Sequence, residues 1–198
     1  ILTARVYDVA VETPLDKAKN LSKRINNNVL MKREDLQPVF SFKLRGAYNK
    51  IDQLLQKGEL EGVIAASAGN HAQGLALAAQ QRGVKATIVM PKTTPAIKVK
   101  AVKDYGARAI LVGDTYDEAY DFAIAEAKEK KLVFVHPYDD PDVIAGQGTV
   151  AMEVLRQYPD DIDAVFIPVG GGGLCAGMAV FLKYLRPETK VIAVEAEE

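Results

Sequence analysis

The stretch Ser41-Phe42-Lys43-Leu44-Arg45-Gly46 begins the segment from which the rest of the chain can be interpreted. Ser41 is a typical helix N-cap, apolar residues then recur on one helical face, and Gly58 is a typical stop. The pattern predicts a helix with Lys43 in its first turn, where unpaired N–H groups lower the pKa of an amine. A neutral lysine amine is what bonding to an aldehyde cofactor requires, although an ordinary surface lysine fits the same pattern.

Composition excludes several functional classes. The chain has 198 residues, 48% of them hydrophobic and 26% charged, and a formal net charge of -1. This is the mixture of a globular protein, and its charge argues against nucleic acid or an acidic membrane surface as a partner. No apolar run approaches the roughly 18 residues of a membrane-spanning helix. A single cysteine excludes an internal disulfide, and two histidines without a second cysteine argue against a zinc cluster. There is no G-x-S-x-G elbow to indicate a serine hydrolase.

Short apolar runs alternate with helical patterns along most of the chain. We expect strands at 29–32, 63–66, 86–90, 108–112, 132–135, 164–169 and 191–195. Besides the Lys43 helix, we expect helices at 15–25, 70–82, 96–105, 116–130, 143–157 and 174–185, although Gly146 and Gly148 weaken the start of one of them. The alternation predicts an α/β fold whose parallel sheet is covered by helices on both faces. Because the last strand ends just before the chain does, we expect a domain that continues beyond residue 198.

Four consecutive glycines, Gly170 to Gly173, lie between a predicted strand and a predicted helix. Such a run costs chain entropy, but it offers backbone N–H donors at a helix N-terminus, which is how many proteins hold a phosphate. Several cofactors carry a phosphate. Gly171, Gly173 and Ala176 also fit the Rossmann fingerprint, with Glu195 where a ribose-binding acid would lie, so a dinucleotide-binding module is a second interpretation.

A second loop of small residues, Ser67-Ala68-Gly69-Asn70-His71-Ala72-Gln73-Gly74, follows the predicted strand 63–66. It leaves backbone amides open at a helix start and would suit a carboxylate. Asn70 is equally well explained as a helix N-cap, and His71 as a hydrogen-bonded polar residue. Cys175 lies where a helix N-terminus could favour a thiolate, but packing explains it better.

The stretches around Lys43, Asn70 and Gly170 occur together and in order, and with them the chain resembles the fold-type II family of pyridoxal-phosphate enzymes. Within this family it is similar over its whole length to the threonine dehydratases. Gln37-Pro38-Val39 and Pro168-Val169 resemble the biosynthetic members of the isoleucine pathway. The implied fold is tryptophan synthase β-like, with two parallel-sheet α/β domains and the cofactor in the cleft between them. The large domain would comprise 1–46 and 148–198 and be truncated, and the small domain would comprise 47–147.

The resemblance implies a role for each of these residues and no metal. Lys43 would bond the aldehyde of pyridoxal 5'-phosphate and serve as general base, while Phe42 would lie against the pyridine ring and Asn70 would bond its 3-hydroxyl. The cofactor phosphate would be held by Gly170, Gly171, Gly172, Gly173 and Leu174. The substrate carboxylate would be received by Ser67, Ala68, Gly69, Asn70 and His71.

The implied reaction is the dehydration and deamination of L-threonine to 2-oxobutanoate and ammonia, with L-serine as a further substrate. A serine dehydratase, a serine racemase or a hydroxyaspartate dehydratase would use the same residues, and the sequence separates these activities poorly. We expect a small amino-acid substrate, an allosteric homo-oligomer (dimer or tetramer), and a cytoplasmic location, or the plastid stroma in a plant. The group facing the pyridine nitrogen would follow residue 198, so we expect the 198 residues alone to fold poorly and to be inactive.

Overall fold

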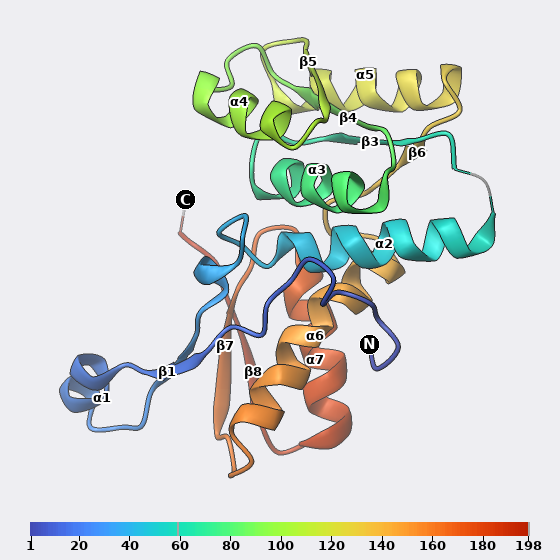
Figure 1. Cartoon of the computed structure of the whole chain (residues 1–198). Coiled ribbons are helices and arrows are strands. Elements are labelled where there is room, and N and C mark those ends of the chain that lie inside the picture. The colour runs from blue at the N-terminus through green and yellow to red at the C-terminus, as the bar shows by residue number, and fades with distance from the viewer. Residues whose placement is uncertain (59, 198) are drawn as a thin grey trace.

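Helices and strands alternate through the computed structural model, which describes residues 1–58 and 60–197 (Figure 1). The strands are β1 (Leu15–Lys17), β2 (Leu30–Lys32), β3 (Val63–Ala66), β4 (Ala86–Met90), β5 (Arg108–Leu111), β6 (Val133–Phe134), β7 (Ala164–Pro168) and β8 (Lys190–Val194). The helices are α1 (Lys19–Ile25), α2 (Lys43–Lys57), α3 (Asn70–Arg82), α4 (Ala96–Asp104), α5 (Tyr116–Glu129), α6 (Pro141–Gln157) and α7 (Gly173–Leu185), and one turn of 3-10 helix covers Glu34–Leu36. In the described part of the chain, no helix is both long and apolar enough to cross a membrane.

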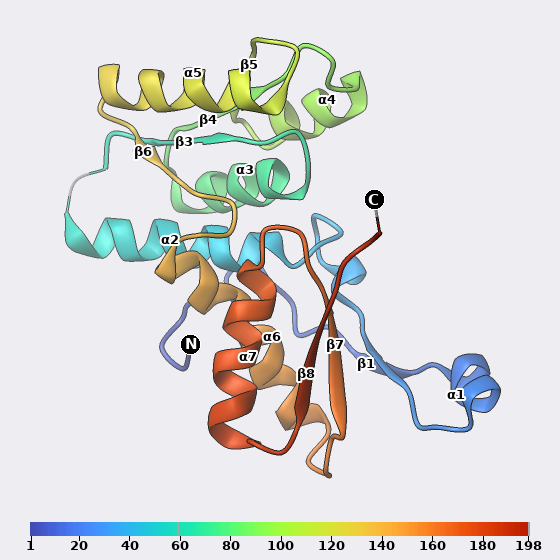
Figure 2. The ribbon, with the colours of Figure 1, turned by 180° about the vertical axis from the view of Figure 1, so that it is seen from behind.

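A four-stranded parallel sheet with the order β5-β4-β3-β6 forms the upper part of the molecule in Figure 1. Both faces of this sheet are apolar, and alternate residues of β3 pack into hydrophobic clusters on opposite faces. Ile64 and Ala66 pack with α5, whereas Val63 and Ala65 pack with α3 and α2. Figure 2 shows α5 along one face of the sheet and α3 and α4 along the other. The parallel sheet with helices on both faces is therefore confirmed.

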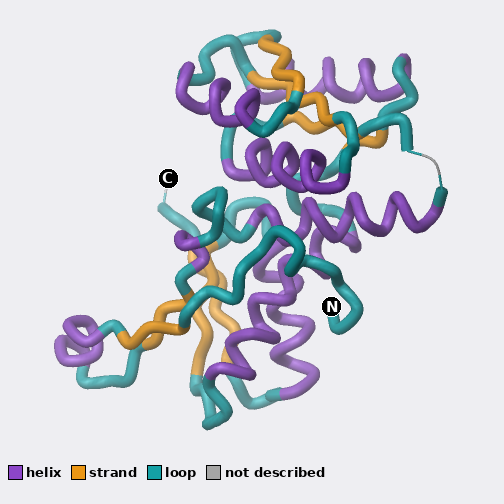
Figure 3. The backbone as a smooth tube through the Cα atoms, viewed as in Figure 1, coloured by secondary structure: helices purple, strands orange, loops and turns teal. Residues whose placement is uncertain are grey.

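The lower part of the molecule contains α2, α6 and α7 and a second, two-stranded parallel sheet, β7-β8. Figure 3 shows α6 and α7 below α2 and beside these two strands. Ile167 of β7 packs against Met178 and Leu182 of α7, while Phe166 on the opposite face of the sheet is exposed. This packing fixes the start of α7, and with it the glycine run, against the body of the protein.

Most predicted elements agree with the structure to within two residues at each end, but the predicted helix 15–25 is confirmed only over its later part, Lys19–Ile25, and is wrong at its start. Its first residues form β1, which pairs antiparallel with β2, with Leu15 opposite Lys32, and α1 connects the two strands. The strand pairing is a contact between distant residues, and it overrides the local helical pattern. The expected cap of α2 also differs: the helix begins at Lys43 with Phe42 in the cap position, and the Ser41 hydroxyl accepts a hydrogen bond from the Lys43 N–H at 3.3 Å.

Candidate active site

Lys43 is the first residue of α2, and its amine is held by the turn that follows β6. The side chain is half-buried, and Nζ donates a hydrogen bond to the carbonyl oxygen of Pro137 at 2.6 Å. Burial lowers the pKa of Lys43 below that of an ordinary lysine, because it disfavours the charged form. The direction is the one expected from the sequence, and burial is a cause that the structure makes visible.

The glycine run meets the same turn. A Cβ atom on Gly171 would lie 2.1 Å from Cδ1 of the Tyr138 ring, and one on Gly173 would lie 2.8 Å from the Tyr138 carbonyl oxygen. Gly172 has a φ of 84°, a left-handed conformation that glycine adopts at little cost. Pro137 holds the lysine and its neighbour Tyr138 covers the glycines, so two stretches more than 120 residues apart converge on one turn. Sequence reasoning missed this turn, whose prolines gave only a general loop signal.

The loop from Ser67 to Gly69 connects β3 to α3 at the carboxyl edge of the four-stranded sheet, and His71 lies in the first turn of α3. Its Gly69 N–H donates to the Ser67 hydroxyl at 3.3 Å, and Asn70 is the exposed first residue of α3. A Cβ on Gly74, one turn further along, would lie 2.8 Å from the backbone nitrogen of Leu44. The beginnings of α3 and α2 are therefore in direct contact, which brings this loop next to Lys43.

His71 is buried, and its Nε2 atom lies 3.0 Å from the carbonyl oxygen of Val135. Its pKa is lowered to about 4, mainly by burial and to a smaller extent by the nearby Lys43, so the ring is neutral near pH 7. Its Nδ1 atom has no hydrogen-bond partner among the described residues. The ring therefore adds no positive charge to the loop, and the attraction for an anion comes from backbone N–H groups at the start of α3.

The remaining candidates lie around the start of α7. Gly170 is exposed with open space where a Cβ would stand, and Leu174 is buried in the core of the lower part. Phe42 and Leu174 line one end of a mostly apolar cavity of about 710 Å³ that extends toward α1, and its lining includes neither Lys43 nor the glycine run. Cys175 is half-buried and packs in the same apolar cluster as Leu174, which agrees with its interpretation as a packing residue.

The sequence of this chain is similar to those of known pyridoxal-phosphate enzymes. The family model described as "Pyridoxal-phosphate dependent enzyme" matches residues 6–198. The biosynthetic L-threonine dehydratase of Burkholderia multivorans is 58% identical over 100% of this chain and 40% of its own length. The chloroplastic biosynthetic threonine dehydratase 1 of Solanum lycopersicum is 58% identical over 98% of this chain and 32% of its own length. This chain thus spans well under half the length of these curated relatives.

Solved structures give the same grouping. The processed form of threonine deaminase isoform 2 from Solanum lycopersicum superposes with a TM-score of 0.94 at 54% identity, covering 98% of this chain and 53% of that one. The serine racemase of maize superposes with a TM-score of 0.92 at 35% identity, covering 97% of this chain and 58% of that one. The fold predicted from the sequence is confirmed by these superpositions.

Proposed function

Because the chain belongs to the family of pyridoxal-phosphate dependent enzymes, we propose that it carries the cofactor lysine, the phosphate loop and the substrate loop of a biosynthetic threonine dehydratase. The reaction is the conversion of L-threonine to 2-oxobutanoate and ammonia, the first step of isoleucine biosynthesis, with L-serine as a further substrate. The observation that carries the proposal is the convergence of Lys43 and the glycine run on the Pro137–Tyr138 turn. The Rossmann interpretation gives no task to Lys43 and ranks below it.

The residues at this turn fit a small phosphorylated aldehyde. The glycine run supplies backbone N–H groups at the positive end of α7, and at Gly171 and Gly173 a side chain would collide with Tyr138. We assign the phosphate to Gly170–Gly173 with Leu174, the aldehyde to Lys43, the ring face to Phe42 and the ring hydroxyl to Asn70. When bound, pyridoxal phosphate takes up the electron pair left on the substrate carbon after a bond to it breaks.

Lys43 suits both tasks assigned to it. A lowered pKa increases the fraction of neutral amine near pH 7, and a neutral amine can attack an aldehyde and afterwards accept the α-proton of the substrate. The hydrogen bond to the Pro137 carbonyl occupies one N–H and leaves the lone pair of the neutral amine free to react. The carboxylate of the amino acid would meet the N–H groups of residues 67–71, and neutral His71 keeps the end of β6 in place beneath them.

A serine racemase or serine dehydratase is the second candidate, because serine racemases share this fold at lower identity. All of these activities use the same lysine and phosphate loop. Turnover of L-threonine, L-serine and D-serine by the full-length protein distinguishes them. The proposal requires L-threonine to have the highest kcat/KM, and a preference for either form of serine contradicts it.

We also propose the organisation that goes with this function. Residues 1–46 and 148–198 are part of the large domain, and the small domain comprises 47–147, so that Lys43 and the glycine run belong to the large domain. The whole protein is a homo-oligomer of the cytoplasm, or of the plastid stroma in a plant. The similarity to bacterial and chloroplastic relatives supports the two proposed locations.

The direct test is to identify the lysine that bonds the cofactor. Full-length protein is mixed with pyridoxal phosphate, reduced with borohydride and cleaved, and the pyridoxyl-bearing peptide is sequenced. We expect the label on Lys43 and its loss in Lys43→Ala. Lys57→Ala is the matched control, since Lys57 lies on the same helix but is exposed at its far end, and it keeps the label. A label on another lysine, or one retained in Lys43→Ala, overturns the proposal.

A further inference from the structure

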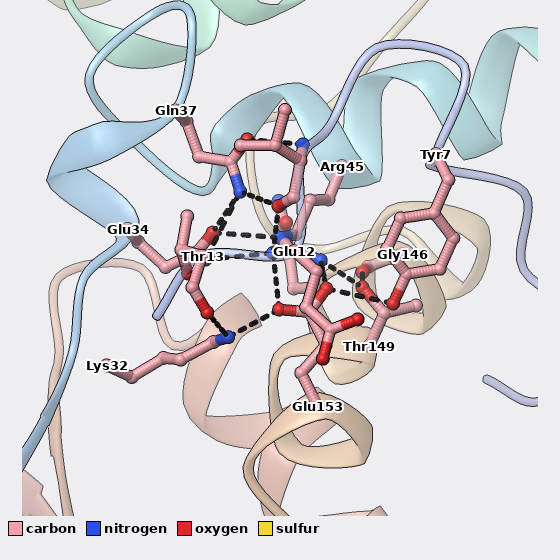
Figure 4. A network of polar contacts seen from close by, with 12 residues as sticks. Tyr7, Glu12, Thr13, Lys32, Glu34, Gln37, Arg45, Gly146, Thr149 and Glu153 are labelled. Atoms are coloured by element: carbon pink, nitrogen blue, oxygen red, sulfur yellow. Dashed lines mark hydrogen bonds and ion pairs between the residues drawn. The ribbon is translucent and has the colours of Figure 1, made fainter. Parts of the chain in front are cut away.

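A buried cluster of charged side chains surrounds Arg45, and the site described above does not use it (Figure 4). Its centre is Arg45, two residues after Lys43 on α2, whose side chain is fully buried. The guanidinium donates through Nε and Nη2 to the two carboxylate oxygens of Glu34, both at 2.8 Å. It also donates through Nη1 and Nη2 to the two oxygens of Glu153, at 2.6 and 3.0 Å.

The cluster is balanced in charge and well supplied with hydrogen bonds. Lys32 Nζ pairs with the second oxygen of Glu153 at 2.5 Å, which gives two cations and two carboxylates. Burial alone would lower the pKa of Arg45, but the carboxylates of Glu34 and Glu153 raise it above its ordinary value. Burial alone would raise the pKa of Glu153, but Arg45 and Lys32 lower it below its ordinary value. Arg45 and Glu153 are therefore both charged at neutral pH.

A buried ion-pair cluster of this kind adds little net stability to a fold. Replacing a buried ion pair by apolar side chains of similar volume is often neutral or stabilising, because the desolvation cost of the charges is large. The best-attested use of buried charges is to select one arrangement of the elements they join. Here they join α2, α6, the 3-10 turn and the N-terminal segment, where the carbonyl of Val11 also accepts from Arg45 at 3.3 Å.

The elements that the cluster joins are the ones that set the position of Lys43. Arg45 lies in the same helical turn as Lys43, and Glu153 lies on α6, which follows the turn that holds the lysine amine. The next residue of α2, Gly46, donates its N–H to the Gln147 side chain of α6 at 3.2 Å. A Cβ on Gly146 would lie 2.6 Å from the carbonyl oxygen of Arg45, so the two helices touch through their backbones.

We propose that Arg45 and Glu153 are positioning residues, whose buried ion pair fixes α2 on α6 so that the Lys43 amine meets the Pro137 carbonyl beside the glycine run. The inference rests on the proposed function, because that function gives the position of Lys43 its importance. Neither residue touches the cofactor in this assignment. Both act through the helix that carries the lysine.

The test removes the pair and keeps the cluster neutral overall, because Lys32 and Glu34 remain as one cation and one carboxylate. Arg45→Met combined with Glu153→Met removes one charge of each sign and replaces both side chains with apolar ones of similar length. In cofactor-free full-length protein, Lys43 is labelled with acetic anhydride over a range of pH, and the labelled peptide is quantified, which reports the pKa of Lys43. Thermal melting of the same samples reports whether each variant is folded.

We expect the double variant to melt within a few degrees of the wild type while the pKa of Lys43 rises toward that of an ordinary lysine. At a fixed pH below both values, the labelling rate falls about tenfold for each unit of this rise. Cofactor affinity, measured separately, falls at least about tenfold, the loss expected when a reacting group is displaced. Arg156→Ala is the control, since it breaks an exposed ion pair with Glu12 between the same helix and the same N-terminal segment. It leaves the labelling of Lys43 unchanged.

A folded double variant with the wild-type labelling profile overturns the proposal. If the double variant does not fold, Glu153→Gln replaces it, because this change keeps the shape of the side chain and removes only its charge. An unchanged Lys43 profile there is equally decisive against it, and unfolding of both variants would show that the cluster stabilises the whole fold instead. Failure of the proposed function gives a different result: the wild type then binds no pyridoxal phosphate, whatever the labelling of cofactor-free protein shows.

Discussion

The contact between Gly146 of α6 and the first turn of α2 gives the sharpest prediction for a single methyl group. A Cβ at position 146 would lie 2.6 Å from the carbonyl oxygen of Arg45, 2.6 Å from Cα of Gly46 and 2.8 Å from the carbonyl carbon of Arg45. All three atoms are backbone, so no side-chain rotation can relieve the collision. Since carbon atoms are comfortable at about 3.5–4.0 Å, Gly146→Ala must push α2 and α6 apart by about 1 Å.

Two opposing effects decide the size of the stability change. Alanine in a helix interior is about 1 kcal/mol more favourable than glycine. Overpacking a well-filled interior costs about 1–3 kcal/mol, and a collision with backbone alone belongs at the upper end of that range. The expected net result is a loss of about 2 kcal/mol in the free energy of unfolding.

The assay has two parts, because the same displacement moves Lys43. Urea unfolding of cofactor-free protein gives the stability change, and a shift of the midpoint at constant m-value shows that only stability has changed. Borohydride trapping gives the effect on the lysine, and a displacement of about 1 Å can cost roughly 100-fold in rate. Ala145→Gly is the control: it loses the helix propensity of one alanine on the same helix and inserts no atom between the helices. If Gly146→Ala is as stable as the wild type and traps the cofactor at the same rate, the backbone contact does not position α2.

Three further predictions concern other parts of the molecule. Gly171→Ala places a Cβ 2.1 Å from the Tyr138 ring, so the cofactor Kd should rise at least about tenfold. Adding Tyr138→Ala should recover part of the lost affinity. An equal loss of affinity with and without the Tyr138 ring contradicts this steric explanation. Thr115→Ala removes the capping box with Glu118 at the start of α5 and should cost about 1 kcal/mol in urea unfolding without changing the cofactor Kd, and a changed Kd would show coupling to the site. His71 has a pKa of about 4 in the fold against 6.5 as an ordinary histidine, so the neutral ring stabilises the protein above pH 6.5, and this contribution of about 3 kcal/mol is lost as the pH falls to 4. Urea midpoints of the wild type should therefore fall more steeply over that range than those of His71→Gln, and parallel curves exclude the effect.

Local patterns were sufficient for the elements whose ends are marked by their own residues. Gly83 ends α3 in the left-handed conformation, and Thr115 caps α5 with a hydroxyl that accepts the N–H of Glu118. The apolar run of β3 is buried along its whole length because helices cover both faces of the sheet. In each case the propensity, the end signal and the tertiary environment favour the same structure, which is when a sequence is easiest to interpret.

Distant contacts account for what the sequence could not provide. Leu15 lies opposite Lys32 in a strand pair, and nothing in residues 15–25 indicates that partner. The Pro137 carbonyl holds the Lys43 amine, but a backbone oxygen has no signature in a sequence. The buried ion pairs of Arg45 could not be predicted from the residues next to it, because their carboxylates come from Glu34 and Glu153.

The glycines of α6 show how a feature that weakens a local prediction can be what the fold requires. Gly146 and Gly148 reduce the helix propensity of α6, and for that reason they counted against its predicted start. In the structure, Gly146 touches the backbone of α2, while a Cβ on Gly148 would lie 2.9 Å from the carbonyl oxygen of Gly177 on α7. Through two glycines that are two residues apart, α6 therefore contacts both α2, which begins with Lys43, and α7, which begins at the end of the glycine run. Larger residues at these positions would separate both helices from α6. The two glycines lower the helix propensity of α6, but they allow the close packing that sets the distance between Lys43 and the phosphate loop.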